Sequence, residues 1–352
     1  MTEDHKKILS VLNFKRILIP IILGLGVAGY LFYQSFDKEV FVNIHWVWYS
    51  YLWLFLAICL MAVRDIAYMY RIRLLTDKQL SWRRSFQVIM LWEFASSVTP
   101  SVVGGSAVAL FIVNKEGINM GRTTAIVMIT AFLDEMFYIL MVPVIIILVG
   151  YKSLFITDAN FAIFNSKFGT LGIFLIGYVF ILILTSIIIY GVFINPRGFK
   201  WILIKIFKLK FLRKWLPKAV ETGDQIITTS KEMKGKPFVF WVKAYVATLF
   251  SWTARYWVVN CMILAFVAVD DHLLIYARQL VMWVILLISP TPGGSGVAEF
   301  VFSDFLRQFI PLGLAPALAL LWRIISFYPY LFIGAIILPG WLNRVYSKAK
   351  KV

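Results

Sequence analysis

Long apolar runs alternate with short polar segments along nearly the whole chain, and this pattern predicts membrane-spanning helices. A helix rises 1.5 Å per residue, so ~20 apolar residues cross a hydrocarbon core of ~30 Å. Six runs reach that length, over residues 17–34, 46–69, 123–150, 169–194, 238–268 and 313–339. We therefore expect an all-α polytopic membrane protein.

Two further apolar runs, 86–114 and 273–310, are interrupted by prolines and glycines. The first contains TPSVVGGS and the second TPGGSG. Each half of a run is too short to cross the hydrocarbon core. We therefore expect each run to enter the membrane and return on the same side, as a broken re-entrant hairpin.

The two broken runs resemble each other. GGSAVALF at 104–111 and GGSGVAEF at 293–300 agree at six of eight positions, at an offset of 189, and a Thr-Pro pair precedes each. A chance match between glycine-rich segments is the alternative. The order of spans and hairpins is also the same in both halves, with the first hairpin entering from inside and the second from outside, which is typical of an inverted-topology repeat.

The repeat predicts how the chain is divided. The N-terminal repeat covers 1–150 and the C-terminal repeat covers 169–339, each with three spans and one re-entrant hairpin. A basic cytoplasmic loop at 195–237 lies within the second repeat.

Composition supports the membrane class. Of 352 residues, 61% are hydrophobic and only 15% are charged, whereas about a quarter are charged in a soluble domain. In a membrane protein, a net charge of +17 indicates positively charged cytoplasmic loops that contact anionic lipid. It does not indicate a nucleic-acid partner. Two cysteines and three histidines indicate neither a disulfide framework nor a metal site, and we expect no cofactor.

Basic residues predict the orientation. With the N-terminus in the cytoplasm, 26 of the 35 Lys and Arg residues fall on inside segments and 5 on outside segments. The positive-inside rule therefore predicts a multi-pass protein of the cytoplasmic (inner) membrane with both termini in the cytoplasm. The run after Lys15 and Arg16 has the pattern of a retained signal anchor.

The segment RGFKWILIKIFKLKFLRKWLP at 197–217 alternates lysines with large apolar residues. This spacing is typical of an amphipathic helix on the anionic inner leaflet. Anchoring of the topology is the favoured role, and a further helix is expected before residue 236.

The chain breaks suggest a ligand site. Proline and glycine leave backbone groups unpaired, which hydrocarbon does not tolerate unless protein or a wet cavity surrounds them. A helix that restarts after a break directs free N–H groups at the gap, which suits a lipid phosphate. A tight hairpin tip without a ligand is the alternative. The candidate binding residues at the tips are Gly104, Gly105, Ser106, Gly293, Gly294, Ser295 and Gly296.

Charged residues inside apolar runs are the other candidates, because each costs about 3 kcal/mol or more at the bilayer centre. Basic members would bind a phosphate and acidic members an amine, so a zwitterionic or cationic headgroup is favoured. The candidate substrate-binding residues are Arg64, Glu93, Asp134, Glu135, Arg255, Glu299 and Arg323.

Structural roles are the alternatives for these charges. Arg64 could extend to the inner face, with Asp65 as a partner, and Glu299 could stabilise the dipole of a restarted helix. Asp134 and Arg323, separated by the repeat offset of 189, could form an ion pair.

The second hairpin and last span, PTPGGSGVAEF followed by LLWRIISFYPYLFIGAI, resemble the lysylphosphatidylglycerol synthase transmembrane family, whose members are also described as flippase-like or UPF-type. The matching residues are Pro290, Pro292, Gly293, Gly294, Gly296, Glu299 and Arg323. The first half agrees more loosely: the break reads SAVALF and the next span has Asp-Glu where the family often has Glu-Arg. The resemblance covers nearly the whole chain, in the form without the cytosolic synthase domain.

The resemblance implies a lipid flippase or a transporter of a lipid-linked intermediate, acting through a midplane cavity between the repeats. An integral-membrane enzyme acting on a lipid headgroup, with Asp134, Glu135 or Glu299 as general base, is the alternative. No GxxxxGK[ST] motif is present, so we expect no nucleotide hydrolysis. The residues after the last span leave no room for the synthase domain, so we expect no synthase activity. Outward aromatic residues either face acyl chains or form a homodimer interface.

Overall fold

The computed structural model describes most of the chain beyond residue 45, together with four helical positions before it (22, 26, 30 and 33). The described ranges are 46–99, 101–155, 160–163, 166–287, 289, 291–311 and 313–349. The predicted first span, 17–34, lies outside these ranges apart from the four positions.

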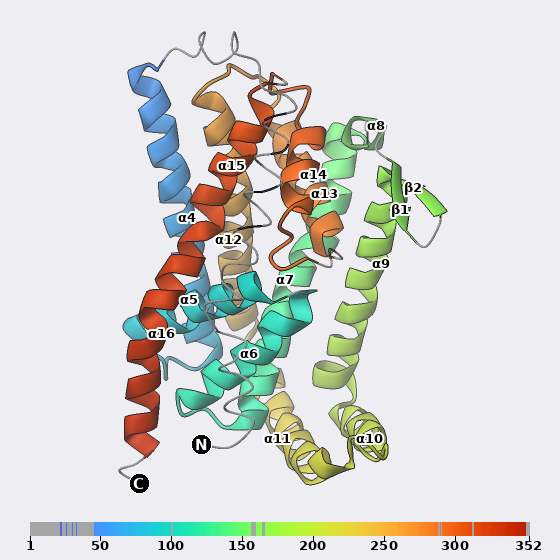
Figure 1. Ribbon diagram of the computed structural model, residues 1–352. Helices are drawn as coiled ribbons and strands as arrows, with labels where there is room; N and C mark the ends of the chain where they lie inside the picture. The colour runs from blue at the N-terminus through green and yellow to red at the C-terminus, as the bar shows by residue number, and fades with distance from the viewer. Residues whose placement is uncertain are drawn as a thin grey trace.

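Long helices form the body of the protein (Figure 1). They are α4 (Trp48–Leu75), α7 (Met120–Val149), α9 (Thr170–Ile188) with a π-helical extension η1 (Ile189–Ile194), α12 (Phe238–Leu264), and α15 (Ala315–Ser326) followed by α16 (Tyr328–Ala349). Within the described ranges, four segments are long and apolar enough to cross a membrane: Trp48–Leu75, Met120–Val149, Thr170–Ile194 and Ala315–Tyr346. The prediction of an α-helical membrane protein is therefore confirmed.

Two of the predicted spans differ from expectation. α12 has 27 residues but is not among these four segments, since Lys243, Arg255 and Asn260 reduce its apolar character. The predicted span 313–339 is two helices that meet at the non-helical residue Phe327, and α16 continues to Ala349.

Both predicted interruptions are present. The first broken pair is α5 (Trp82–Val98) and α6 (Ser101–Lys115), and the second is α13 (His272–Leu287) and α14 (Val297–Phe305). In Figure 1 the first pair begins and ends toward the lower end of the molecule and the second toward the upper end. Each pair therefore has the form of a hairpin, while the symmetry relating the two halves stays a prediction.

The glycines play different parts in the two hairpins. Gly104 and Gly105 lie inside α6, so the expectation that they sit at the break is wrong. A Cβ on Gly105 would stand 2.2 Å from Ser96 Oγ, so this glycine allows α5 and α6 to approach closely. Gly293 has a φ of +58°, and a Cβ there would stand 2.4 Å from the Phe327 ring, so this break needs glycine for both reasons.

Helix packing encloses the centre of the molecule. α4 packs along α12, and α16 packs along α5. At the second contact, a Cβ on Gly334 would stand 2.3 Å from Phe94 Cβ. These contacts bring α4, α5, α12 and α16 together, although they are far apart in sequence.

The basic loop is helical, as expected. α10 (Pro196–Phe207) buries none of its residues, and Trp201 is 62% exposed. A 3-10 turn, η2 (Arg213–Trp215), leads to α11 (Leu216–Lys234), which packs against α10. The regular helix therefore ends at Phe207, ten residues before the end of the predicted amphipathic segment 197–217.

A small β-hairpin was not expected. After α8 (Tyr151–Leu154), strands β1 (Asn160–Ile163) and β2 (Ser166–Gly169) pair antiparallel, with Asn160 opposite Gly169. Helices still dominate the described residues, so the all-α class stands.

Ion pairs join the elements at the lower end of Figure 1. Asp77 after α4 accepts hydrogen bonds from Arg122 at 2.5 Å and Lys236 at 2.6 Å. Partial burial raises the pKa of Asp77, but these two hydrogen bonds outweigh it and hold the pKa below its usual range.

Glu116, in the turn after α6, makes the most buried of these contacts. Its side chain is fully buried and accepts bonds from Trp341 Nε1 at 2.7 Å and from both terminal nitrogens of Arg344. This contact fixes the end of the first hairpin to α16.

We expect Glu116→Gln to lower the free energy of unfolding by about 3 kcal/mol, because Arg344 loses its buried counter-charge. Glu232→Gln is the matched control, since Glu232 is half exposed and lies 3.8 Å from Arg122. Thermal unfolding of the purified variants in detergent measures the difference. Equal unfolding temperatures for the two variants would contradict the role given to Glu116.

Candidate functional site

A cavity of about 260 Å³ lies where the two hairpins meet the long helices. Ser97 and Thr99 from the first break, and Ser289, Thr291 and Gly293 from the second, line it. The predicted meeting of the two breaks is therefore present. The charged lining residues are Arg64, Arg71, Glu93, Asp134, Glu135, Arg255 and Arg323.

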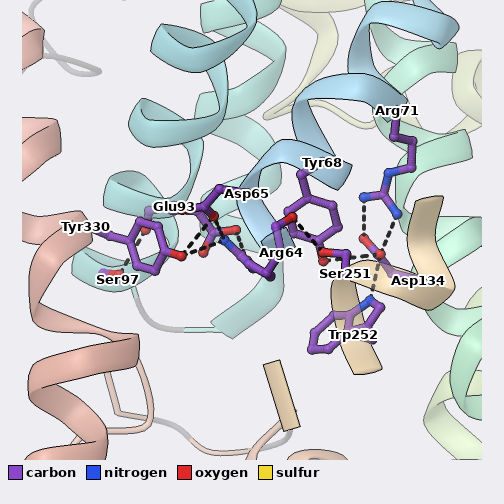
Figure 2. Close-up of polar contacts among 10 residues, drawn as sticks. All are labelled: Arg64, Asp65, Tyr68, Arg71, Glu93, Ser97, Asp134, Ser251, Trp252 and Tyr330. Atoms are coloured by element: carbon purple, nitrogen blue, oxygen red, sulfur yellow. Dashed lines mark hydrogen bonds and ion pairs between the residues drawn. The ribbon is translucent and has the colours of Figure 1, made fainter. Parts of the chain in front are cut away.

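The first charged cluster is centred on Arg64 of α4, which is 1% exposed (Figure 2). Its guanidinium donates to Glu93 at 2.5 Å, to Asp65 at 2.8 Å and to Tyr330 Oη at 3.0 Å. Tyr330 in turn donates to Asp65 at 2.9 Å. Arg64 therefore joins α4, α5 and α16, and its side chain is buried and does not extend toward the inner membrane face. The pairing of Arg64 with Asp65 is confirmed.

The second cluster is centred on Asp134 of α7. Arg71 donates to both of its carboxylate oxygens, at 2.6 and 3.1 Å, and Trp252 Nε1 donates at 2.8 Å (Figure 2). Arg71 also donates to Thr248 at 2.8 Å. This cluster joins α4, α7 and α12.

One aromatic ring links these two clusters. The Tyr68 ring centroid lies 4.4 Å from the guanidinium carbon of Arg64 and 4.4 Å from that of Arg71. Cation–π attraction on a shared ring therefore helps α4 hold two like charges in one cavity wall.

The third cluster closes the second break. Arg323 Nε lies 2.9 Å from Glu299 Oε1, and Arg323 Nη2 donates to Gly293 O at 3.0 Å and Ser295 Oγ at 2.9 Å. Its guanidinium carbon lies 3.7 Å from the Phe327 ring centroid. Arg323 therefore fixes α15 to the tip of the second hairpin.

Glu299 serves the backbone of its own helix. It is 0% exposed, and its Oε2 accepts a 2.6 Å bond from the N–H of Gly296 at the start of α14. The structural interpretation of Glu299 as a partner of the helix start is therefore confirmed, and Glu299 does not line the cavity. The alternative that Asp134 and Arg323 form an ion pair is wrong, because Asp134 pairs with Arg71 and Arg323 pairs with Glu299.

Two charged groups of the cavity wall lack a counter-charge within the described part of the chain. Arg255 lies over Trp283, 4.2 Å from its ring centroid, and its buried Nε has no hydrogen-bond partner. Glu135 is 5% exposed, and its buried Oε2 has no partner either. Since the other cavity charges have partners, these two are the ones free to meet a ligand.

The remaining candidates have scattered positions. Ser106, Gly293 and Gly294 line the cavity, as do Glu93 and Glu135. Ser295 and Gly296 support Arg323 and Glu299 as described above, outside the lining. Gly104 and Gly105 lie in α6, also outside it.

Several cavity residues were missed from the sequence. Arg71 lies beyond the end of the predicted span 46–69, but α4 extends to Leu75 and buries it. The spacing of Arg64, Tyr68 and Arg71 at i, i+4 and i+7 places them on one helix face and could have shown this. Trp252 lies three residues before Arg255, and this spacing likewise places the two residues on one face of α12.

Metal chemistry has no candidate in the described ranges, where no group of three His, Cys, Asp or Glu side chains could hold an ion. Cys59 and Cys261 are free thiols. The expectation that no cofactor is used stays a prediction.

The helices and the buried charged cavity define a polytopic α-helical membrane protein. The sequence model of the lysylphosphatidylglycerol synthase TM region matches residues 17–334, and the chain belongs to this family. A UPF0104 membrane protein of Archaeoglobus fulgidus is 27% identical over 336 residues, covering 91% of this chain and 95% of the relative. No solved structure matches the chain.

We expect Arg323→Gln and Glu299→Gln each to lower the free energy of unfolding by about 3 kcal/mol, since each leaves a buried charge without its partner. The double variant should lose less than the sum, because neither charge then remains. A double-mutant cycle from thermal unfolding in detergent measures this coupling. Strictly additive losses would contradict the pairing.

Proposed function

We propose that this protein is a flippase-like transporter that moves a polar or aminoacylated phospholipid, or a lipid-linked intermediate, across the cytoplasmic membrane. The observation that carries the proposal is a charged cavity inside an apolar helical protein, at the junction of two helix breaks. A charged headgroup is expensive to place in hydrocarbon, so a route across the membrane must supply polar surroundings.

The size of the cavity supports a headgroup as the transported part. About 260 Å³ accommodates a phosphate and a small polar group. The acyl chains would stay in the surrounding bilayer while the headgroup moves between leaflets.

The charges of the cavity support an amine on the substrate. Glu135 lines the cavity without a counter-charge in the described chain, so an ammonium group would neutralise it. An aminoacylated or other amine-bearing headgroup supplies that ammonium together with a phosphate.

The distribution of basic residues on the surface supports a location in the cytoplasmic membrane. The basic segments after α4, between α6 and α7, and at α10 and α11 all lie at the lower end in Figure 1. α10 exposes Trp201 beside its lysines, which suits contact with an anionic leaflet. We infer that this end faces the cytoplasm.

The alternative is an integral-membrane enzyme acting on a lipid headgroup. The unpartnered carboxyl of Glu135 is the observation that favours it, because a general base must be free to accept a proton. Mass spectrometry of the lipids recovered from the transport assay separates the two: a transporter leaves them chemically unchanged.

We expect Thr130→Trp to abolish lipid translocation, because Thr130 lines the cavity and an indole there fills it. The assay uses proteoliposomes with headgroup-labelled phospholipids and quenching of the outer leaflet. Ile147→Trp is the matched control on the same helix, since Ile147 is 81% exposed. Full translocation by the Thr130→Trp variant would place the route outside this cavity.

We expect Glu135→Gln to reduce translocation of an aminoacylated phospholipid by about tenfold, because the ammonium loses a charge-assisted contact. Translocation of phosphatidylglycerol, which has no amine, should change much less. Glu232→Gln, on the exposed surface of α11, is the control. An equal fall for both lipids would count against an amine contact at Glu135.

A further inference from the structure

The cavity charges differ in how they are neutralised. Arg64 has Asp65 and Glu93, Arg71 has Asp134, and Arg323 has Glu299. Among the residues that the structure describes, Arg255 alone of the four cavity arginines has no carboxylate within ion-pair distance. A guanidinium stays protonated in proteins, so Arg255 brings an uncompensated positive charge to the cavity wall.

Aromatic rings hold this guanidinium in position. Arg255 is 9% exposed, and its guanidinium carbon lies 4.2 Å from the Trp283 ring centroid and 5.7 Å from that of Trp252. Its Nε is buried and has no hydrogen-bond partner. A buried, oriented cation with an unused donor is the arrangement that an anionic ligand completes.

Unused hydroxyl groups line the same cavity. Thr130 Oγ1 is buried without a partner. Ser289 and Thr291 have hydroxyl oxygens 3.1 Å apart, so one of their two hydrogens remains free for another acceptor. Hydroxyl donors and a guanidinium lining one cavity match the oxygen atoms of a phosphate group.

We propose that Arg255 is the anion-binding residue of the cavity and that its ligand is the single phosphodiester of a phospholipid. This inference rests on the proposed function, because it names the part of the headgroup that the cavity holds. A pyrophosphate fits poorly, since it brings further negative charge to a cavity where, among the described residues, Arg255 is the one arginine without a carboxylate partner and the carboxyl of Glu135 has no counter-charge.

Arg64 provides the contrast that makes the inference testable. Arg64 and Arg255 precede the glycine pairs of their hairpins by similar distances along the chain, 40 and 38 residues. Yet Arg64 has two carboxylates and a tyrosine as partners, whereas Arg255 has none that the structure describes. Removing Arg64 should damage the fold, and removing Arg255 should damage ligand binding.

The experiment measures binding of dihexanoyl phosphatidylglycerol to the purified full-length chain in a non-ionic detergent by calorimetry, with thermal unfolding of each variant beside it. We expect Arg255→Gln to weaken binding by roughly 10- to 100-fold, as expected for a lost charge-assisted hydrogen bond. Its unfolding temperature should be unchanged or higher, because an unpaired buried charge has been removed. Arg255→Lys should recover only part of the affinity, since an ammonium lacks the planar fork.

Three probes identify the ligand. Dihexanoylglycerol, which lacks the phosphate, should not bind. Glycerol phosphate should bind far more weakly than the lipid; equal, Arg255-dependent affinity would show that the phosphate comes from solution and would overturn a lipid source. Geranyl pyrophosphate should bind more weakly too, and tighter binding than phosphatidylglycerol would overturn the single phosphodiester.

Other outcomes decide the role of Arg255. Unchanged lipid affinity in Arg255→Gln, or a lowered unfolding temperature that accounts for the loss, would overturn the inference. Arg64→Gln is the control, and it should lower the unfolding temperature.

The translocation assay separates this inference from the proposed function. Arg255-dependent lipid binding without translocation by the wild-type protein would reject the flippase and keep the phosphate site. Translocation by the wild-type protein with unchanged lipid binding in Arg255→Gln would reject the site and keep the flippase.

Discussion

Polar groups inside an apolar helical protein must find their partners within the protein, and this constraint shapes the centre of the molecule. The two helix breaks free backbone carbonyls that regular helices would have satisfied. In the first hairpin, the hydroxyls of Ser97 and Thr99 donate back to carbonyls within α5, those of Glu93 and Ala95, and so find partners inside the protein. In the second, Arg323 donates to Gly293 O, a carbonyl at the break itself. At the second break, a nearby side chain therefore satisfies a backbone group that no regular helix satisfies.

The same constraint explains why one face of α4 joins so much of the structure. Arg64 and Arg71 need counter-charges, and these come from α5 and α7 as well as from the neighbouring Asp65. Tyr330 of α16 joins the first cluster. Ion pairs thus hold together helices that are far apart in sequence. The same pairs neutralise most of the cavity charges, so these charges are not available to bind a ligand.

The fold was predictable to the extent that it depends on local pattern. Apolar length predicted the long helices, and Thr-Pro and glycine predicted both breaks. The interruption at Phe327 was missed although Pro329 stands in the first turn of α16, where proline is a signal for the start of a helix. The position of Gly105 was missed because its close approach to Ser96 depends on how α5 and α6 pack.

The site was predictable in its members but not in its partners. Buried charges are expensive, so Arg64, Asp134, Glu135, Arg255 and Arg323 could be identified from their apolar surroundings. Pairing depends on which helix faces meet, and the offset of 189 suggested Asp134 with Arg323. The structure pairs Asp134 with Arg71 and Arg323 with Glu299 instead. Equivalent positions in the two halves of the sequence therefore do not determine which acidic and basic side chains form ion pairs.

In the described part of the chain, the two hairpin tips contact each other without an ion pair, unlike the charged clusters described above. A Cβ on Gly293 would stand 3.2 Å from Ser97 O, so the tips approach through backbone atoms. Arg323, by contrast, holds the second tip to α15 through charge, and Glu93 holds the first hairpin to α4. Separating the tips would cost van der Waals contact at Gly293, whereas separating either hairpin from its neighbouring helix would break a buried ion pair. Under the proposed function, a headgroup would therefore leave the cavity most easily where the two breaks face each other.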